Sequence, residues 1–357
     1  MGTVTLSQVK LGDKIGEDVL TPLGGVLFQK GRVVTSRELE IMQAFQVMSV
    51  TIESLIGAMK SKEETQALEA KQTSKTAGGS DLHNEYDRML TLLRQALNNY
   101  VSGDKFPIMD IRMQLEKLLQ HMGSYNVITF APRTFAERDY WLHNSVASAI
   151  TSYLIAQWVK LPQKDWMQVA LAGLLHDAGN IRIDPSILLK PTSLTIEEQA
   201  EVQQHPTIGY QLLRNIAGIN EGVKLAALQH HERVDGSGYP QGMDGETIHP
   251  YAKIVAIADI FHAMTLNKAY RKGVSPYFVL EQIQSDSFGK LEPGYVRVFI
   301  EKATQFHNGT VVRLSDDRVG EIVFSDSMHP TRPWVSVNGA IINLTIERQL
   351  HINEVIR

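Results

Sequence analysis

The sequence predicts a mainly α-helical protein, with a helical-bundle core, a small α+β module before it and a small β domain after it. Between Phe135 and about Gln305, apolar residues recur every three or four positions, which is typical of helices that bury one face. After His307 the period changes to two, in short runs separated by turn residues, which indicates a small β-barrel or meander.

The remaining segments follow from their local patterns. The N-terminal segment mixes short β-like runs with one helix that begins at Thr35 or Ser36, and the polar stretch after it has too few large apolar side chains for a core. Two helical patterns then lead into the bundle. The predicted order is an α+β module (1–56), a partly helical linker (57–82), a helical connector (83–133), the bundle (134–305) and a β domain (306–357).

Composition narrows the classes of partner and compartment. The formal net charge of -4 gives no electrostatic reason to expect a nucleic-acid polymer as the main partner. The chain has no cysteine, so any metal must take imidazole and carboxylate ligands rather than thiolates. No stretch approaches the roughly 18 apolar residues of a membrane span, and the N-terminus lacks the apolar region of a signal peptide. We therefore expect a cytoplasmic protein with no membrane contact of its own.

Several ionisable residues occupy positions where the helical pattern calls for core residues. Any one of them alone is more simply explained as a buried residue satisfied by a neighbour. Together, burying so many carboxylates and imidazoles unpaired costs a few kcal/mol for each group, and a shared cation removes that cost for all. The set predicts a cluster of at least two metal ions and comprises Asp139, His143, His176, Asp177, His205, His230, His231 and Asp259.

The residue types of this cluster indicate hydrolytic chemistry. A carboxylate such as Asp177 can bridge two cations, and mixed imidazole and carboxylate ligation suits Fe, Mn, Zn or Ni better than Ca. Two ions about 3.5 to 4 Å apart lower the pKa of a bridging water and hold a phosphoryl oxygen. The sequence therefore predicts a metal-dependent phosphohydrolase.

The same residues carry a resemblance to a known family. His176-Asp177, His205-Pro206 and the run HHERVDGSGYP from His230 to Pro240 resemble an HD-GYP domain, a branch of the HD phosphohydrolase superfamily. The resemblance covers about residues 135–305. It implies a helical bundle that hydrolyses cyclic di-GMP, a bacterial second messenger, with a centre of two or three iron or manganese ions.

The resemblance also implies roles for individual residues. Lys268 and Arg271 match the family's positions for holding phosphate or guanine, although most such residues are solvated charges. Asp139 stands where members with three metals carry a Glu. The metal ligands of the family fall on His143, His176, Asp177, His205, His230, His231 and Asp259.

The glycine-rich run next to the histidine doublet adds candidate substrate contacts. Gly236 and Gly238 permit close approach of the backbone to a ligand, and Tyr239 offers a ring and a hydroxyl to a nucleotide. A rigid turn with a packed tyrosine is the alternative reading.

Two positions depart from the family pattern. Asn180 replaces a lysine, so a hydrogen-bond donor remains for a phosphoryl oxygen but a positive charge is missing. His262 replaces an aspartate one turn after Asp259, where it is an extra metal ligand, a proton donor to the leaving oxygen or a packed imidazole.

The leading hypothesis is a cyclic di-GMP phosphodiesterase in which a metal-bridging hydroxide, held by Asp177 and Asp259, attacks phosphorus and yields pGpG, GMP or both. Metal ions and Lys268 or Arg271 would meet the charge on the phosphoryl oxygens. The alternatives are a catalytically weakened cyclic di-GMP receptor, an HD phosphohydrolase for another nucleotide, and a scaffold without metal. A homodimer or a signalling protein is the expected macromolecular partner.

Overall fold

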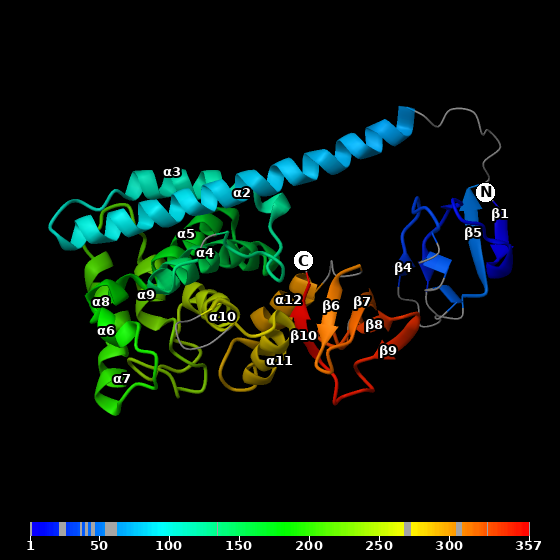
Figure 1. Cartoon of the computed structure of the whole chain (residues 1–357). Helices are drawn as coiled ribbons and strands as arrows, with labels where there is room; N and C mark the ends of the chain where they lie inside the picture. Colours follow the sequence, from blue (N-terminus) through cyan, green and yellow to red (C-terminus); the bar gives the residue numbers. More distant parts are fainter. Residues whose placement is uncertain are drawn as a thin grey trace. The chain divides into compact units, whose positions relative to one another are not determined.

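The computed structural model describes two compact units, one formed by residues Lys75–Gln305 and the other by Met1–Ser74 with Phe306–Arg357 (Figure 1). Side chains of residues 26, 63–80 and 137 fall outside the description. The residues described are 2–20, 26–35, 38–39, 42–43, 47–53, 63–133, 135–267, 273–304, 309–326 and 328–356.

The unit from 75 to 305 is helical, as the pattern of apolar residues predicted. Short 3-10 helices join some of its helices: η2 (Met122–Ser124), η3 (Glu137–Asp139) and η4 (Ala178–Arg182). The α-helices that lie in it or reach into it are α2 (Glu63–Val101), α3 (Ile108–Leu119), α4 (Tyr140–Trp158), α5 (Gln163–Leu175), α6 (Pro185–Leu188), α7 (Ile196–Val202), α8 (His205–Leu213), α9 (Glu221–Gln229), α10 (Pro250–Thr265), α11 (Pro276–Asp286) and α12 (Pro293–Thr304).

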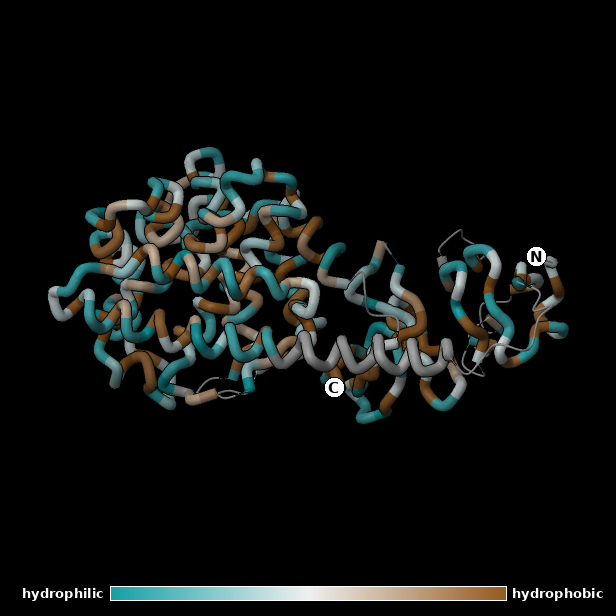
Figure 2. The backbone as a smooth tube through the Cα atoms, turned by 90° about the horizontal axis from the view of Figure 1, so that it is seen from above, coloured by the Kyte–Doolittle hydropathy of each residue, from teal (hydrophilic) through white to brown (hydrophobic). Residues whose placement is uncertain are grey.

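Helices α4, α5 and α10 form the centre of this unit because they are apolar on almost every side. Helix α4 packs against both α5 and α10, and α9 packs against α5, α8 and α10. At Gly173 an added Cβ would lie 2.7 Å from the carbonyl oxygen of Ser148, so glycine is what allows α4 and α5 to approach this closely. In Figure 2, hydrophobic stretches run through the helical unit, whereas many of its outer turns are hydrophilic.

The second unit consists of antiparallel strands. One sheet has the order β1-β5-β2, and β3 pairs with β4. The third has five strands in the order β10-β6-β7-β8-β9. Their bounds are β1 (Gly2–Thr5), β2 (Lys14–Ile15), β3 (Val19–Leu20), β4 (Val26–Phe28), β5 (Ser49–Glu53), β6 (Val311–Leu314), β7 (Val319–Phe324), β8 (Trp334–Val337), β9 (Ala340–Asn343) and β10 (Ile352–Val355), with the short helix η1 (Leu6–Gln8).

The two terminal segments share a hydrophobic core within this unit. Val323 of β7 belongs to the same buried cluster as Ile15, Phe28 and Val50 of the N-terminal segment. Among the C-terminal strands, the β8–β9 hairpin turns at Asn338 and Gly339, whose φ angles of 50° and 82° suit a two-residue loop between twisted strands.

The predicted fold class is confirmed, with a helical core, small N-terminal strands and a small C-terminal sheet. The helix predicted from Thr35 lies largely outside the described residues. The described part of the predicted linker, residues 63–82, belongs to α2. The domain boundaries remain a prediction. No helix of the described chain combines the length and apolarity needed to cross a membrane.

Candidate metal centre

The centre begins where α5 ends. A run of buried apolar residues carries α5 to Leu175, and His176 caps the helix while its backbone is still helical. Asp177 then precedes η4, so the change from one helix type to the other lets two adjacent side chains face one cavity. Gly179 brings the next ligand close, because a Cβ there would lie 2.0 Å from the carbonyl oxygen of His205.

The other candidate ligands lie at helix ends or within a buried helix. His205 is the first residue of α8, and His230 follows the last residue of α9. His231 comes next in the chain. Asp259 lies in α10 among apolar neighbours. The structure therefore brings four separate segments together at one point, as the helical faces predicted.

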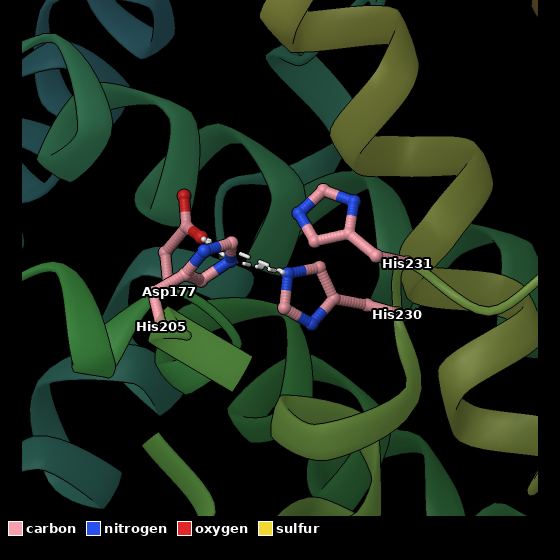
Figure 3. Close-up of side chains that lie close together, drawn as sticks. All are labelled: Asp177, His205, His230 and His231. Atoms are coloured by element: carbon pink, nitrogen blue, oxygen red, sulfur yellow. Dashed lines mark hydrogen bonds and ion pairs between the residues drawn. The ribbon is translucent and has the colours of Figure 1, made fainter. Parts of the chain in front are cut away.

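Asp177 faces the imidazoles of His205 and His230 (Figure 3). Its Oδ1 is 3.3 Å from His205 Nε2 and 3.7 Å from His230 Nε2, and its Oδ2 is 3.5 Å from His176 Nε2. His176 Nε2 is also 3.5 Å from Asp259 Oδ1. Two groups of ligand atoms result, each with all its atoms within 4.8 Å: Asp177 with His205, His230 and His231, and Asp177 with His176 and Asp259.

Backbone contacts orient three of the imidazoles. Nδ1 of His176, His205 and His230 lies 2.8, 2.6 and 3.0 Å from the carbonyl oxygens of Gly173, Val202 and Ala227. A carbonyl only accepts, so each Nδ1 carries the proton and each neutral ring keeps a lone pair on Nε2. Yet the Nε2 atoms of His205 and His230 are only 3.2 Å apart. Two lone pairs at this distance need a proton or a cation between them.

The charge of the cluster follows from burial and neighbours. Burial raises the pKa of Asp177, but the nearby His176, His205 and His230 outweigh burial and hold it well below its usual value. For His176 burial lowers the pKa, but Asp177 and Asp259 raise it to about 9. Burial holds the pKa of His230 and, more strongly, of His231 below the ordinary value. Without a metal the centre thus combines two carboxylates and a protonated His176 with neutral His230 and His231.

These residues fit a divalent metal. His176 Nε2 is buried and has no hydrogen-bond partner among the described residues, which is costly for a polar atom unless something else binds it. The donor set is imidazole nitrogen and carboxylate oxygen, the set preferred by transition metals in the absence of thiolates. The cluster could therefore bind metal, with Asp177 shared between two positions.

Two predicted ligands, Asp139 and His143, lie outside both groups. Asp139 Oδ2 is 2.9 Å from Arg94 Nη2, so a guanidinium of α2 already neutralises this carboxylate. His143 is buried beside Tyr86, whose hydroxyl is 3.2 Å from His143 Nδ1. Burial lowers the pKa of His143 to about 4, Asp139 opposes this and Arg94 adds to it.

His262, one turn after Asp259, is a packed imidazole in this structure. Its Nε2 lies 2.7 Å from Thr151 Oγ1, which in turn lies 3.1 Å from the hydroxyl of Tyr125. Burial lowers the pKa of His262 to about 3, so the ring is neutral. Of the three readings left open by the sequence, the internal hydrogen bond favours the packed one.

The glycine-rich run wraps closely around the histidine doublet. The ring of Tyr239 stacks on His231, with centroids 4.6 Å apart and planes at 19°. A Cβ at Gly238 would lie 2.4 Å from the amide nitrogen of Arg233, so only glycine fits there. Gly236 has a φ of 77°, a conformation that favours glycine.

A buried carboxylate that sequence reasoning missed holds this loop. Glu232 accepts hydrogen bonds from the backbone amides of Gln241 at 2.7 Å and Met243 at 3.0 Å. Its place next to the doublet was visible in the sequence, but its partners are loop amides with no side-chain signature.

A cavity of about 810 Å³ opens onto the cluster. Asn180, a predicted substrate contact, lines it, and its side-chain oxygen is buried without a hydrogen-bond partner among the described residues. Lys268 and Arg271, the predicted cationic contacts, lie outside the described residues. The cavity also has lining residues that were not predicted: Arg138, Trp141, Asn144, Lys190 and Thr192.

Comparison with known proteins agrees with this geometry. Residues 130–289 match a family model described as an HD domain. The chain is 30% identical over 212 residues to a Pseudomonas aeruginosa protein named cyclic di-GMP phosphodiesterase, covering 59% of this chain and 51% of that protein. It is 39% identical over 194 residues to a Thermotoga maritima protein of the same name, covering 54% and 50%.

A third relative is named for a different cyclic dinucleotide. It is the 3'3'-cGAMP-specific phosphodiesterase 1 of Vibrio cholerae, 35% identical over 138 residues, covering 38% of this chain and 32% of that protein. The chain thus spans about half or less of the length of these relatives. Residues 130–289 therefore match an HD domain, and the run from His230 to Pro240 within them resembles the HD-GYP type.

Proposed function

We propose that this chain is a metal-dependent phosphodiesterase that hydrolyses cyclic di-GMP to pGpG, GMP or both. The observation that carries the proposal is the position of Asp177, which belongs to two adjacent groups of potential metal ligands at the edge of a cavity. Relatives named as cyclic di-GMP phosphodiesterases support the choice of substrate.

We infer that His176, Asp177, His205, His230, His231 and Asp259 hold two divalent cations, iron or manganese. Such ions supply the positive charge and Lewis acidity that phosphodiester hydrolysis needs. The chain's own part is to orient the imidazoles through backbone carbonyls, to keep both carboxylates ionised and to shape the surrounding space. The attack by a bridging hydroxide stays a prediction, as do the roles of Asp139, His143, Lys268 and Arg271.

The cavity supports a nucleotide-sized substrate. Its volume of about 810 Å³ lies within the range of roughly 300 to 1,000 Å³ that small-molecule sites occupy. Tyr239 lines it and Gly238 lets the backbone lie close to His231, so the loop of the motif forms part of the wall. Lys190 also lines it, but its ammonium is held by Glu198 at 2.6 Å.

Two alternatives rest on specific observations. Asn180 brings an amide where a cation would assist phosphoryl transfer, which favours a receptor that binds cyclic di-GMP and turns it over slowly. The relative named for 3'3'-cGAMP favours a phosphohydrolase for another cyclic dinucleotide. We rank both behind the phosphodiesterase because every residue of the two ligand groups is present.

The test is turnover by the full chain, purified without oxygen and loaded with iron or manganese. Cyclic di-GMP, 3'3'-cGAMP and a linear dinucleotide are supplied separately, and products are separated by chromatography. We expect cyclic di-GMP to be cleaved, and Asp177→Ala to lower the rate by on the order of a thousandfold, since losing even one stabilising group costs roughly 10² to 10³. Asp110→Ala, at an exposed position in the first turn of α3, is the control. Tight binding without cleavage would establish the receptor instead.

A further inference from the structure

Asn144 is a buried amide at the edge of the candidate metal centre. It follows His143 in α4, is only 2% exposed and lines the same cavity as Asp177 and Asp259. Neither the helical pattern nor the family resemblance singles it out. Its side chain nevertheless makes a short contact with a candidate ligand, because Asn144 Nδ2 lies 2.6 Å from Asp259 Oδ1.

That contact fixes which way the amide points. An ionised carboxylate only accepts hydrogen bonds, so the NH₂ group of Asn144 must face Asp259, and the reversed amide would set two oxygens against each other. The carbonyl oxygen, Oδ1, therefore points elsewhere. It is buried, and no hydrogen-bond partner for it exists among the described residues. One end of the amide thus has a partner in the protein and the other end does not.

The oxygen that Asn144 holds belongs to a candidate metal ligand and lies close to another one. Asp259 Oδ1 is also 3.5 Å from His176 Nε2, in the group formed by His176, Asp177 and Asp259. A hydrogen bond from α4 to a carboxylate of α10 restricts the rotation of that carboxylate, and α4 and α10 pack directly against each other. Groups that orient ligands in this way tune metal affinity.

We propose that Asn144 is a positioning residue of the metal centre, whose amide NH₂ holds Asp259 Oδ1 toward His176 and whose carbonyl oxygen offers a neutral acceptor to a ligand in the cavity. This inference rests on the metal-binding part of the proposed function. It assigns Asn144 no contact with the reacting atoms.

Other polar residues of α4 are buried without lining the cavity, which sets them apart from Asn144. Ser145, Ser148 and Ser152 are buried with hydroxyls that have no hydrogen-bond partner among the described residues. None of the three lines the cavity, whereas Asn144 does. Ser145 is therefore a matched control, one residue away in the same helix.

The experiment measures manganese binding to the full chain without substrate. Asn144→Leu keeps the shape of the side chain and removes both polar atoms, and Asn144→Ala removes the side chain, so either variant suffices if the other does not fold. We expect the manganese affinity to fall roughly 10- to 100-fold in both, as for other orienting groups around metals, and to stay within about twofold in Ser145→Ala. Isothermal titration of the metal-free proteins gives the dissociation constants.

A double-mutant cycle separates positioning from a general structural effect. If Asn144 acts through Asp259, Asn144→Leu should have little further effect on manganese affinity in an Asp259→Ala background. An equal loss in both backgrounds overturns the proposal, as does unchanged affinity in Asn144→Leu and Asn144→Ala, or a wild-type chain that binds no manganese. Because no nucleotide is present, weakened metal binding in the Asn144 variants upholds the inference even if cyclic di-GMP proves not to be a substrate.

Discussion

Two regions of the helical unit bury ionisable side chains, but the side chains differ in whether they have hydrogen-bond or ion-pair partners within the protein. In the cluster around Asp177, His176 Nε2 has no hydrogen-bond partner in the part of the chain that the structure describes, and the Nε2 atoms of His205 and His230 face each other at 3.2 Å. At the rim, meaning Asp139 and His262, each group has a partner inside the protein. Arg94 lies 2.9 Å from Asp139, and Thr151 lies 2.7 Å from His262.

The difference shows what distinguishes a metal ligand from a buried polar residue. Both regions place a carboxylate or an imidazole on a helix that also carries apolar residues, so position on the helix does not separate them. What separates them is whether the polar atoms are already satisfied. A group with an internal partner stabilises the fold, whereas a group without one can bind something that the chain does not itself supply.

The largest expected effect is the stabilisation of the folded chain by manganese, compared between variants of Asp177 and Asp139. A cation that binds only the folded chain stabilises it by about 3 kcal/mol when its concentration is a hundred times the dissociation constant. We expect manganese to stabilise the wild type by this amount and to have little effect on Asp177→Ala. Asp139→Ala should keep most of the stabilisation, because Asp139 is paired with Arg94.

Urea unfolding with manganese and with a chelator measures these differences. The chelator arm shows what each substitution costs the metal-free fold. If Asp139→Ala loses the manganese effect as completely as Asp177→Ala, the distinction between cluster and rim is wrong.

The sequence predicted the cluster better than the rim for a physical reason. Helical spacing and helix ends place His176, Asp177, His205 and His230 on inward faces, and these features are local. The partner of Asp139 is not local. Arg94 lies on α2, and nothing in the pattern of either helix links the two residues.

Asn144 was missed for a related reason. An asparagine in a helix carries no sign of its partner, and its role becomes visible only when α4 meets α10 at Asp259. The same holds for Glu232, whose partners are backbone amides of a loop. The layout of helices and strands was more predictable, because it depends on the period of apolar residues and on turns such as Asn338-Gly339.

A second test concerns the imidazole of the rim. Burial lowers the pKa of His262 from 6.5 to about 3, so the unfolded chain takes up a proton at this residue before the folded chain does. Stability is therefore lost as the pH falls from about 6.5 toward 3. Between pH 7 and pH 4.5 we expect His262 to account for a loss of about 2 kcal/mol.

His262→Gln keeps a polar side chain next to Thr151 but removes the titration. Urea unfolding at both pH values, in chelator, should show a smaller acid-induced loss in the variant than in the wild type. Equal losses would mean that His262 is not held neutral by burial, and the contrast with the cluster would then fail for this residue.

The smallest expected effect on stability comes from a variant that tests whether Asp139 can bind a metal ion once its ion-pair partner is removed. Arg94→Met removes the guanidinium 2.9 Å from Asp139 and leaves this largely buried carboxylate beside the mostly exposed Arg138, 4.0 Å away. Because Arg94 is partly exposed, the free energy of unfolding should fall by less than about 1 kcal/mol. The manganese content per chain should rise, since the exposed Arg138 pairs only weakly with Asp139, which also has the imidazole of His143 nearby.

Elemental analysis of the desalted, manganese-loaded variant measures that content. Arg88→Met is the matched control, because Arg88 also lies on α2 but pairs with Glu85 of the same helix rather than with Asp139. A content equal to that of the wild type would show that Arg94 is not what keeps a cation from Asp139. The pairing of Asp139 with Arg94 would then not be the reason that Asp139 binds no metal. The shape of the site around Asp139 would have to explain why Asp177 binds a cation and Asp139 does not.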